Sequence, residues 1–140
     1  MIITTPKSYI ADIKNHFSIV GFPDRNRNSV KNFKIGDRIV FYVTKRSVFG
    51  TVAEVTSDYF YDTKEIWDEE FDFWPHRVKC KPIYTMTDFT KMVYIKDIWD
   101  NLTFIKNKHK WGSQVQGSFR KLSEHDFNVI EAEVALRCKK

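Results

Sequence analysis

The side chains best suited to chemistry in this 140-residue sequence are aromatic and basic rather than nucleophilic. Trp74 stands just before a predicted strand, and Trp111 stands inside the basic run 105–121. An indole in a polar, basic segment can stack on an unpaired base while nearby lysines neutralise phosphates. The alternative for each tryptophan is a structural one, in which the indole caps one end of the fold or packs beneath its own loop.

The charge distribution favours a polyanionic partner. The chain holds 23 Lys and Arg against 18 Asp and Glu, a formal net charge of +5. Two stretches are basic and poor in acids: 24–34 holds only Asp24, and 105–121 holds no acid. Because phosphate backbones bind such clusters, we expect phosphate contacts in both stretches. The residues predicted to make them are Arg25, Arg27, Lys106, Lys108, Lys110 and Arg120.

The sequence carries no recognisable catalytic motif. Its four histidines are scattered, and none stands at zinc-ligand spacing from a cysteine. Cys80 falls inside an alternating stretch, which predicts a buried structural thiol rather than a nucleophile. The acids in 61–72 could bind a metal or act as a base, but a solvated loop is favoured because no matching acids stand elsewhere. We therefore predict a protein that is not an enzyme, with no catalytic residue, no metal and no cofactor.

Two alternatives stay open beside a nucleic-acid-binding module. One is an enzyme acting on RNA or a nucleotide, with Asp72 or Glu54 as its acid. The other is a protein-interaction domain that uses its aromatic surface. In the pocket, an acid with a raised pKa beside a basic residue would favour the enzyme. An exposed apolar patch instead of a pocket would favour the interaction domain.

Composition bounds the elements that must position these side chains. Hydrophobic residues make up 42% and charged residues 29%, as in a globular protein, and the length predicts one domain over 1–140. No apolar run approaches about 18 residues, which predicts no membrane span. The first residues lack the pattern of a signal peptide. Cys80 and Cys138 are predicted to be reduced thiols, so we expect a cytoplasmic protein.

Helical spacing predicts helices at both ends of the chain. Thr5-Pro6 predicts the start of a helix over 6–17, because Thr caps a first turn and Pro fits its first position. The apolar positions of that helix are Tyr9, Ile10, Ile13 and Phe17. Ser123 is the predicted N-cap of the last helix, and a short helix is predicted over 95–99. The inner face of the last helix carries Phe127, Ile130 and Val134.

Strands are predicted between these helices. Gly36 marks a tight turn over 34–37. The stretch after it is apolar on both faces, which suits a buried strand of a closing barrel. The predicted strands are 1–4, 38–44, 47–56, 77–84 and 102–105. The order of elements predicts an α+β domain containing a small barrel.

A series of short motifs follows along the chain. They are Val20-Gly21-Phe22-Pro23, Arg27-Asn28, Lys34-Ile35-Gly36-Asp37, Phe41-Tyr42, Gly50 with Ala53-Glu54-Val55, Trp74 with Arg77-Val78, and Leu102-Thr103-Phe104-Ile105. In order and spacing they resemble the EVE domain, and the likeness covers nearly the whole chain. EVE domains belong to the PUA-like superfamily and are similar to YTH domains, which read methyladenine in RNA.

The resemblance implies a fold and a function. The fold is a PUA-like bent β-barrel of five or six strands flanked by helices, with one pocket at its side. Relatives use that pocket to hold a flipped, modified base in an aromatic cage, and methyladenine and methylated or hydroxymethylated cytosine have been associated with it. The resemblance thus implies a non-catalytic reader of RNA or DNA that carries a modified base.

The resemblance also implies where the cage lies. It would combine the segment 19–22 with Trp74 and the segment around Trp111. Many relatives have Trp where this chain has Val20, and their Tyr-His-Ser appears here as Tyr42-Val43-Thr44. A buried methyl group adds about 0.8 kcal/mol, so sharp discrimination needs polar contacts to the base edge as well. The predicted base-binding residues are Val20, Gly21, Phe22, Asn28, Tyr42, Thr44, Ser47, Trp74 and Trp111.

Overall fold

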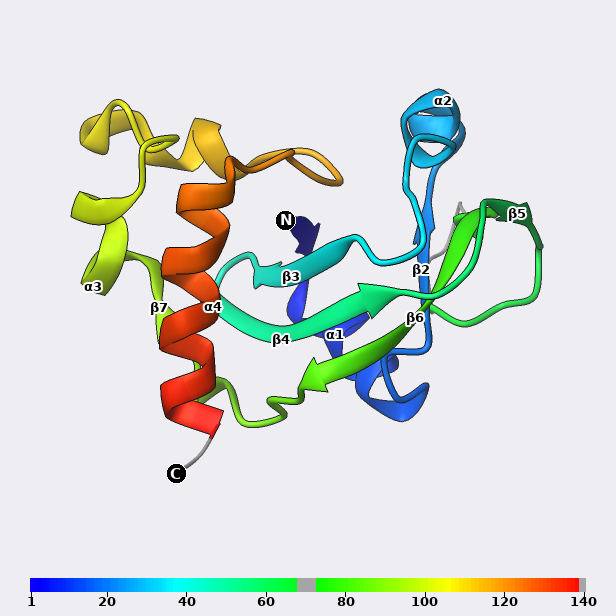
Figure 1. The fold of residues 1–140 in the computed structure, drawn as a ribbon, viewed down its shortest axis with the longest axis horizontal. Coiled ribbons are helices and arrows are strands. Elements are labelled where there is room, and N and C mark those ends of the chain that lie inside the picture. Colours follow the sequence, from blue (N-terminus) through cyan, green and yellow to red (C-terminus); the bar gives the residue numbers. More distant parts are fainter. Residues whose placement is uncertain (68–72, 139–140) are drawn as a thin grey trace. The chain divides into compact units, whose positions relative to one another are not determined.

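The computed structural model describes residues 1–67 and 73–138 (Figure 1). Asp68, Glu69, Glu70 and Asp72 of the acidic run lie outside the described residues. The chain groups into two compact units. The first unit comprises Met1–Pro6, Val40–Val52 and Tyr84–Lys140, and the second comprises Lys7–Ile39 and Ala53–Ile83. The expectation of one domain over 1–140 stays a prediction.

Seven strands and four α-helices lie in the described residues. The strands are β1 (Ile2–Thr4), β2 (Ile19–Phe22), β3 (Arg38–Val43), β4 (Val48–Val55), β5 (Phe60–Tyr61), β6 (His76–Tyr84) and β7 (Val93–Tyr94). The α-helices are α1 (Pro6–Lys14), α2 (Arg27–Val30), α3 (Ile95–Ile98) and α4 (Glu124–Cys138). The 3-10 helices are η1 (Asp24–Asn26), η2 (Phe89–Lys91), η3 (Trp99–Asn101) and η4 (Lys108–Val115). Within the described part of the chain, every helix is too short or too polar to cross a bilayer.

In the first unit, the strands pair as their apolar patterns require. β1 runs parallel to β3, with Ile2 opposite Phe41, and β7 runs antiparallel to β4, with Phe49 opposite Val93. The side chains of β3 from Ile39 to Val43 are all buried, which confirms the prediction of a strand buried on both faces. α4 packs against β7.

The start of α4 corrects one predicted strand. Ser123 caps the helix, since its Oγ accepts a hydrogen bond from the Asp126 amide at 3.1 Å. The buried Asp126 carboxylate in turn accepts hydrogen bonds from the Thr103 and Phe104 amides at 2.8 and 3.1 Å. These amides cannot join a β-ladder. The strand predicted over 102–105 is therefore wrong, and this segment is a turn held by a carboxylate.

In the second unit, β6 is the central strand. β2 and β5 both run antiparallel to it, with Gly21 and Phe60 each opposite Arg77 and Tyr61 opposite His76. β2 has no counterpart among the predicted strands, because four residues before a proline are too short to show an alternating pattern.

The first helix ends earlier than predicted. α1 stops at Lys14, and His16 and Phe17 adopt left-handed backbone φ values of 57° and 52°. The Phe17 amide donates to the carbonyl of Asp12 at 2.8 Å, which closes the end of the helix. This turn packs the Phe17 ring edge-on against Tyr9, with 5.1 Å between ring centroids. Burial of an aromatic pair thus overrides the continuation of the helix to residue 17.

Candidate functional site

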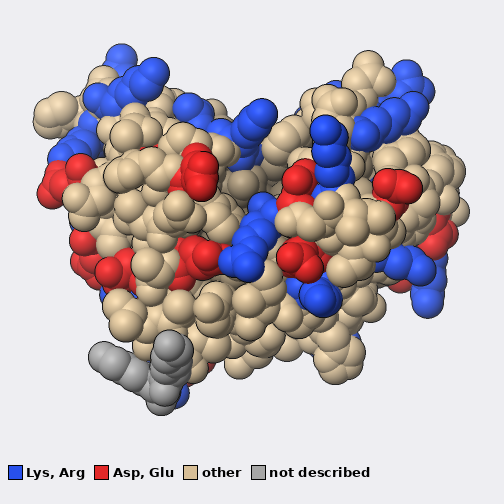
Figure 2. All heavy atoms as spheres, in the orientation of Figure 1, with Lys and Arg blue, Asp and Glu red and all other residues tan. Residues whose placement is uncertain are grey.

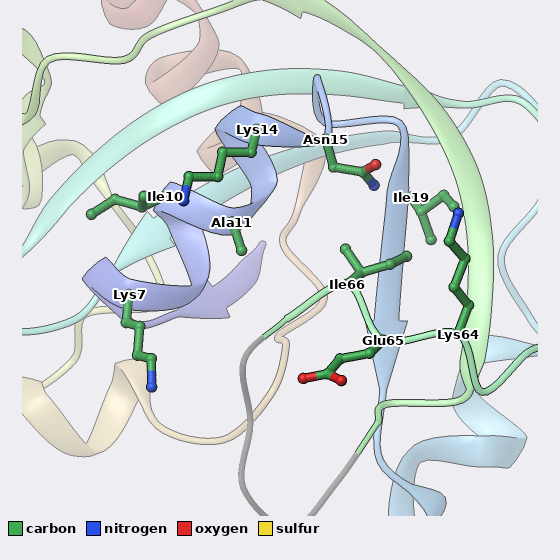
Figure 3. A pocket seen from close by; sticks show the side chains of 9 residues that line it. All are labelled: Lys7, Ile10, Ala11, Lys14, Asn15, Ile19, Lys64, Glu65 and Ile66. Carbon is green, nitrogen blue, oxygen red and sulfur yellow. The ribbon is translucent and has the colours of Figure 1, made fainter.

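A pocket of about 430 Å³ opens in the second unit (Figure 3). That volume is within the usual range for sites that bind small molecules. Its lining residues come from α1, the start of β2 and the segment 64–66. They are Lys7, Ile10, Ala11, Lys14, Asn15, Ile19, Lys64, Glu65 and Ile66. The lining thus combines aliphatic walls with three ammonium groups and one carboxylate.

The geometry of α1 explains how the helix supplies half of this pocket. Lys7, Ile10, Ala11 and Lys14 are spaced three, four and seven residues apart, so they share one face. Tyr9 and the neighbouring positions on the other side of the helix are buried in the unit. Ile10 is 45% exposed. Helical periodicity alone does not separate Ile10 from the adjacent Tyr9, although only Tyr9 is buried.

Asn15 supplies a hydrogen-bond donor without a partner. Its Nδ2 atom is buried, and among the described residues it makes no hydrogen bond. Figure 3 shows this amide directed toward the space between α1 and β2. A buried N–H that lacks an acceptor costs about 1–3 kcal/mol. A ligand acceptor in the pocket would remove that cost.

Trp67 directly follows Ile66, which lines the pocket, and its contacts support that edge of the pocket. Its Nε1 donates to Asp12 Oδ1 at 2.7 Å, and its ring lies 5.2 Å from the ring of Trp74 at an interplanar angle of 46°. Gly21 lies against the same indole. A Cβ at Gly21 would stand 2.6 Å from two carbons of the Trp67 ring and 2.6 Å from the Trp74 carbonyl oxygen. Only glycine fits this close approach.

Arg77 holds the segment that carries this edge of the pocket. Its side chain is fully buried. Nε donates to the Trp74 carbonyl at 3.0 Å, and Nη2 donates to the carbonyls of Phe73 and Lys64. The guanidinium carbon lies 5.3 Å from the centroid of the Trp67 ring. One side chain therefore fixes both ends of the segment 64–74 by charge-assisted hydrogen bonds.

Two buried groups near the pocket have shifted pKa values. Burial raises the pKa of Asp12 to about 7, against the opposing effect of the Trp67 hydrogen bond. Burial and the nearby Asp12 carboxyl raise the pKa of Cys80 to about 12. The Cys80 Sγ donates to the Phe17 carbonyl at 2.8 Å. These observations confirm the prediction of a structural thiol.

The predicted base-binding residues are divided between the two units. In the second unit Val20 and Phe22 are buried, Asn28 is exposed on α2, and Trp74 is half-buried with a left-handed φ of 48°. In the first unit Tyr42 is buried, Thr44 and Ser47 are half-buried, and Trp111 packs edge-on against Trp99 at 6.2 Å. None of the nine lines the pocket of Figure 3, although Ile19 of the segment 19–22 does. The aromatic cage stays a prediction.

The sequence could have indicated part of the pocket. Lys7 and Lys14 stand at the spacing of one α1 face together with Ile10, and Asn15 directly follows the helix, so this polar stripe is visible in the sequence. The contribution of 64–66 was not visible, because it depends on the Arg77 hydrogen bonds to distant carbonyls.

The predicted phosphate-binding residues are divided between the two units. In the second unit Arg25 and Arg27 are exposed on η1 and α2. In the first unit the predicted lysines Lys106, Lys108 and Lys110 are all exposed. Lys108 forms an ion pair with Asp100. The half-buried Arg120 lies over the Phe104 ring at 5.4 Å.

The described residues contain no group of three or more His, Cys, Asp or Glu side chains that could hold a metal ion. Glu54, one of the two acids considered for catalysis, pairs with Lys81 at 3.7 Å. Asp72, the other, lies outside the described residues.

The amino-acid sequence is similar to those of known proteins. The family model described as the EVE domain matches residues 2–133. A UPF0310 protein of Pyrococcus abyssi is 33% identical over 126 residues, which cover 82% of this chain and 85% of that protein. A UPF0310 protein of Pyrococcus horikoshii is 31% identical over 133 residues, which cover 85% and 87%.

A solved structure shares the fold at low sequence identity. It is the YTH domain of Zygosaccharomyces rouxii MRB1, in complex with N6-methyladenosine RNA. It superposes with a TM-score of 0.63 at 13% identity, covering 95% of this chain and 85% of that one. The match confirms the expected α+β fold. The described residues hold seven strands, of which β5 and β7 have two residues each, against the five or six expected.

Proposed function

The chain belongs to the EVE domain family, and on that premise we propose that it binds nucleic acid and holds one modified base in the pocket of Figure 3. The proposal contains no catalytic step. The observation that carries it is the pocket itself, in which an unpartnered amide donor and three lysines surround an aliphatic slot. The structural neighbour in complex with N6-methyladenosine RNA supports it.

Each part of the pocket suits one part of a flipped nucleotide. The Asn15 amide can donate to a ring nitrogen or carbonyl oxygen of the base, and the Glu65 carboxylate can accept from an exocyclic N–H. The side chains of Ile10, Ile19 and Ile66 can cover a methyl group. The lysines can neutralise the flanking phosphates. Flipping the base costs a few kcal/mol, which these contacts must offset.

A binding screen tests the proposal. Single strands and duplexes carrying one N6-methyladenine, 5-methylcytosine or 5-hydroxymethylcytosine are compared with unmodified strands at two salt concentrations. Burial of a methyl group is expected to make one modified strand bind at least about four-fold more tightly than its plain counterpart. Equal affinity for every modified and plain strand would contradict base reading while leaving nucleic-acid binding intact.

A charge placed in the pocket should weaken binding. Ile10→Glu introduces a carboxylate beside the expected base and phosphates, and we expect a loss of affinity of at least about ten-fold, or 1.4 kcal/mol. The matched control is Ile35→Glu, since Ile35 is 63% exposed in the turn before β3. Fluorescence anisotropy with the preferred strand measures both. Similar losses in the two variants would mean that the pocket does not hold the base.

The basic surface of the first unit should set salt dependence without base preference. Lys108→Gln together with Lys110→Gln should weaken all strands alike. The slope of log affinity against log salt should fall by about 1.8 for duplexes and about 1.4 for single strands, because each neutralised phosphate contributes about 0.9 or 0.7. Titration at several salt concentrations measures the slope. A changed preference for the modified base with an unchanged slope would contradict the assignment.

A further inference from the structure

Two tyrosine rings pack around one buried histidine in the second unit, away from the residues that line the pocket. His76 is 3% exposed, whereas Tyr61 is 62% exposed. Tyr61 stands opposite His76 in the pairing of β5 with β6, and its ring meets the imidazole edge-on at 5.5 Å. The Tyr59 ring is nearly parallel to the imidazole, at 5.8 Å and 16°. The strand pairing thus holds the solvent-exposed Tyr61 ring in a fixed position against His76.

Hydrogen bonds use both nitrogens of that imidazole. His76 Nε2 lies 2.6 Å from Asp24 Oδ1, and Nδ1 lies 2.7 Å from the Tyr59 hydroxyl. An ionised carboxylate only accepts, so Nε2 carries the proton and donates to Asp24. The Tyr59 hydroxyl and Nδ1 share the second hydrogen bond. These two hydrogen bonds fix the positions of Tyr59 and of η1, where Asp24 stands.

A cation borders the Tyr59 ring. The Lys31 ammonium lies 5.3 Å from the centroid of that ring. Arg27 is four residues before Lys31, at the start of α2, and the two residues are neighbours on the helix surface. Both are exposed. Figure 2 shows Lys and Arg side chains gathered over α2. Asp24, the acid that begins η1, has its carboxylate engaged by His76.

We propose that the exposed Tyr61 ring, with Lys31 and Arg27 on the Tyr59 side of the same cluster, is a stacking platform for an unpaired base of a single-stranded nucleic acid. The proposal rests on the proposed function and adds a second contact on the bound strand. A tyrosine ring held in one cluster with ammonium and guanidinium groups matches a base with its adjoining phosphates. The ring faces of paired bases are covered by their neighbours, so a duplex does not fit. An acidic peptide would use the cations without needing the ring.

The test compares Tyr61→Ala with Tyr61→Phe on a plain uridine decamer. Loss of one stacked base predicts that Tyr61→Ala binds about 5- to 150-fold more weakly. Tyr61→Phe keeps the ring and should bind like the unmodified chain. Tyr94→Ala is the matched control, since Tyr94 is a 38% exposed tyrosine of a two-residue strand in the first unit. Circular dichroism of each variant verifies that it is folded.

An abasic decamer separates stacking from charge. It keeps the phosphates but has no bases, so Tyr61→Ala should not weaken its binding, whereas Lys31→Gln should lower the single-strand salt slope by about 0.7. The proposal is overturned if Tyr61→Ala binds the uridine decamer as tightly as the unmodified chain does. It is also overturned if Tyr61→Ala weakens binding of the abasic strand, or of a polyglutamate peptide, as much as it weakens binding of the uridine decamer. It is also overturned if no oligonucleotide binds. Failure of base reading alone would abolish the preference for a modified strand and leave the Tyr61 effect on the uridine decamer unchanged.

Discussion

Replacing Arg77 with leucine should lower the free energy of unfolding by about 3–5 kcal/mol, because three carbonyls lose a charged donor and such hydrogen bonds contribute about 1.5–3 kcal/mol each. Part of that loss is offset because leucine buries no charge. The side chain is fully buried and donates to the carbonyls of Lys64, Phe73 and Trp74. Leucine would leave these carbonyls without their donor and would remove the cation beside the Trp67 ring. Arg77→Lys should also be destabilising, because an ammonium cannot reproduce the planar fork of donors.

Urea denaturation measures this loss. The matched control is Lys79→Leu on the same strand, because Lys79 is exposed two residues further along β6 and surface substitutions usually change stability by less than about 0.5 kcal/mol. If Arg77→Leu were as stable as Lys79→Leu, the network would not hold the segment 64–74. The edge of the pocket at Lys64–Ile66 would then need another explanation.

Asp12→Asn should stabilise the protein above neutral pH and change how stability varies with pH. Burial raises the pKa of Asp12 to about 7 from an ordinary value of 3.8. Below pH 3.8 the folded and unfolded chains both carry the proton. Between pH 3.8 and 7 the unfolded chain loses the proton while the folded chain keeps it, so Asp12 reduces stability as pH rises. The reduction reaches roughly 4 kcal/mol above pH 7, at about 1.4 kcal/mol for each pKa unit.

Asparagine keeps an acceptor for the Trp67 Nε1–H but cannot ionise, so the variant should escape this reduction. Denaturation midpoints measured from pH 4 to pH 8 should diverge from those of the unmodified protein as pH rises. Asp58→Asn is the control, because Asp58 is exposed in the same unit. A variant that is stabilised equally at pH 4 and pH 8 would show that the effect does not come from the ionisation of Asp12.

Local sequence patterns correctly predicted the elements whose buried side chains follow the regular spacing of a strand or a helix. The strand β3 is apolar on both faces, and the turn before it has Gly36 at a φ of 97°, where glycine is favoured. The last helix begins at its predicted cap, with Ile130 and Val134 buried. In each case the signal lies within a few neighbouring residues.

The errors arose where distant side chains decide the local structure. The turn at Thr103 is fixed by Asp126, which stands 23 residues further along the chain. The end of α1 is fixed by the packing of Phe17 on Tyr9. The pocket depends on Arg77 binding carbonyls on both sides of Trp67. Its aliphatic walls could not be anticipated from a search for exposed tryptophans.

The contact between Gly21 and Trp67 also restricts how these two positions can change during evolution. A side chain added at 21 meets the indole and the Trp74 carbonyl at once, so that substitution is harmful while Trp67 is present. A smaller residue at 67 would remove only the clash with the indole, since the Trp74 carbonyl oxygen is a backbone atom that any residue at 74 carries. Positions in such direct contact have non-additive effects. A lineage that carries alanine or serine at 21 should therefore differ both in the residue at 67 and in the backbone path at 74.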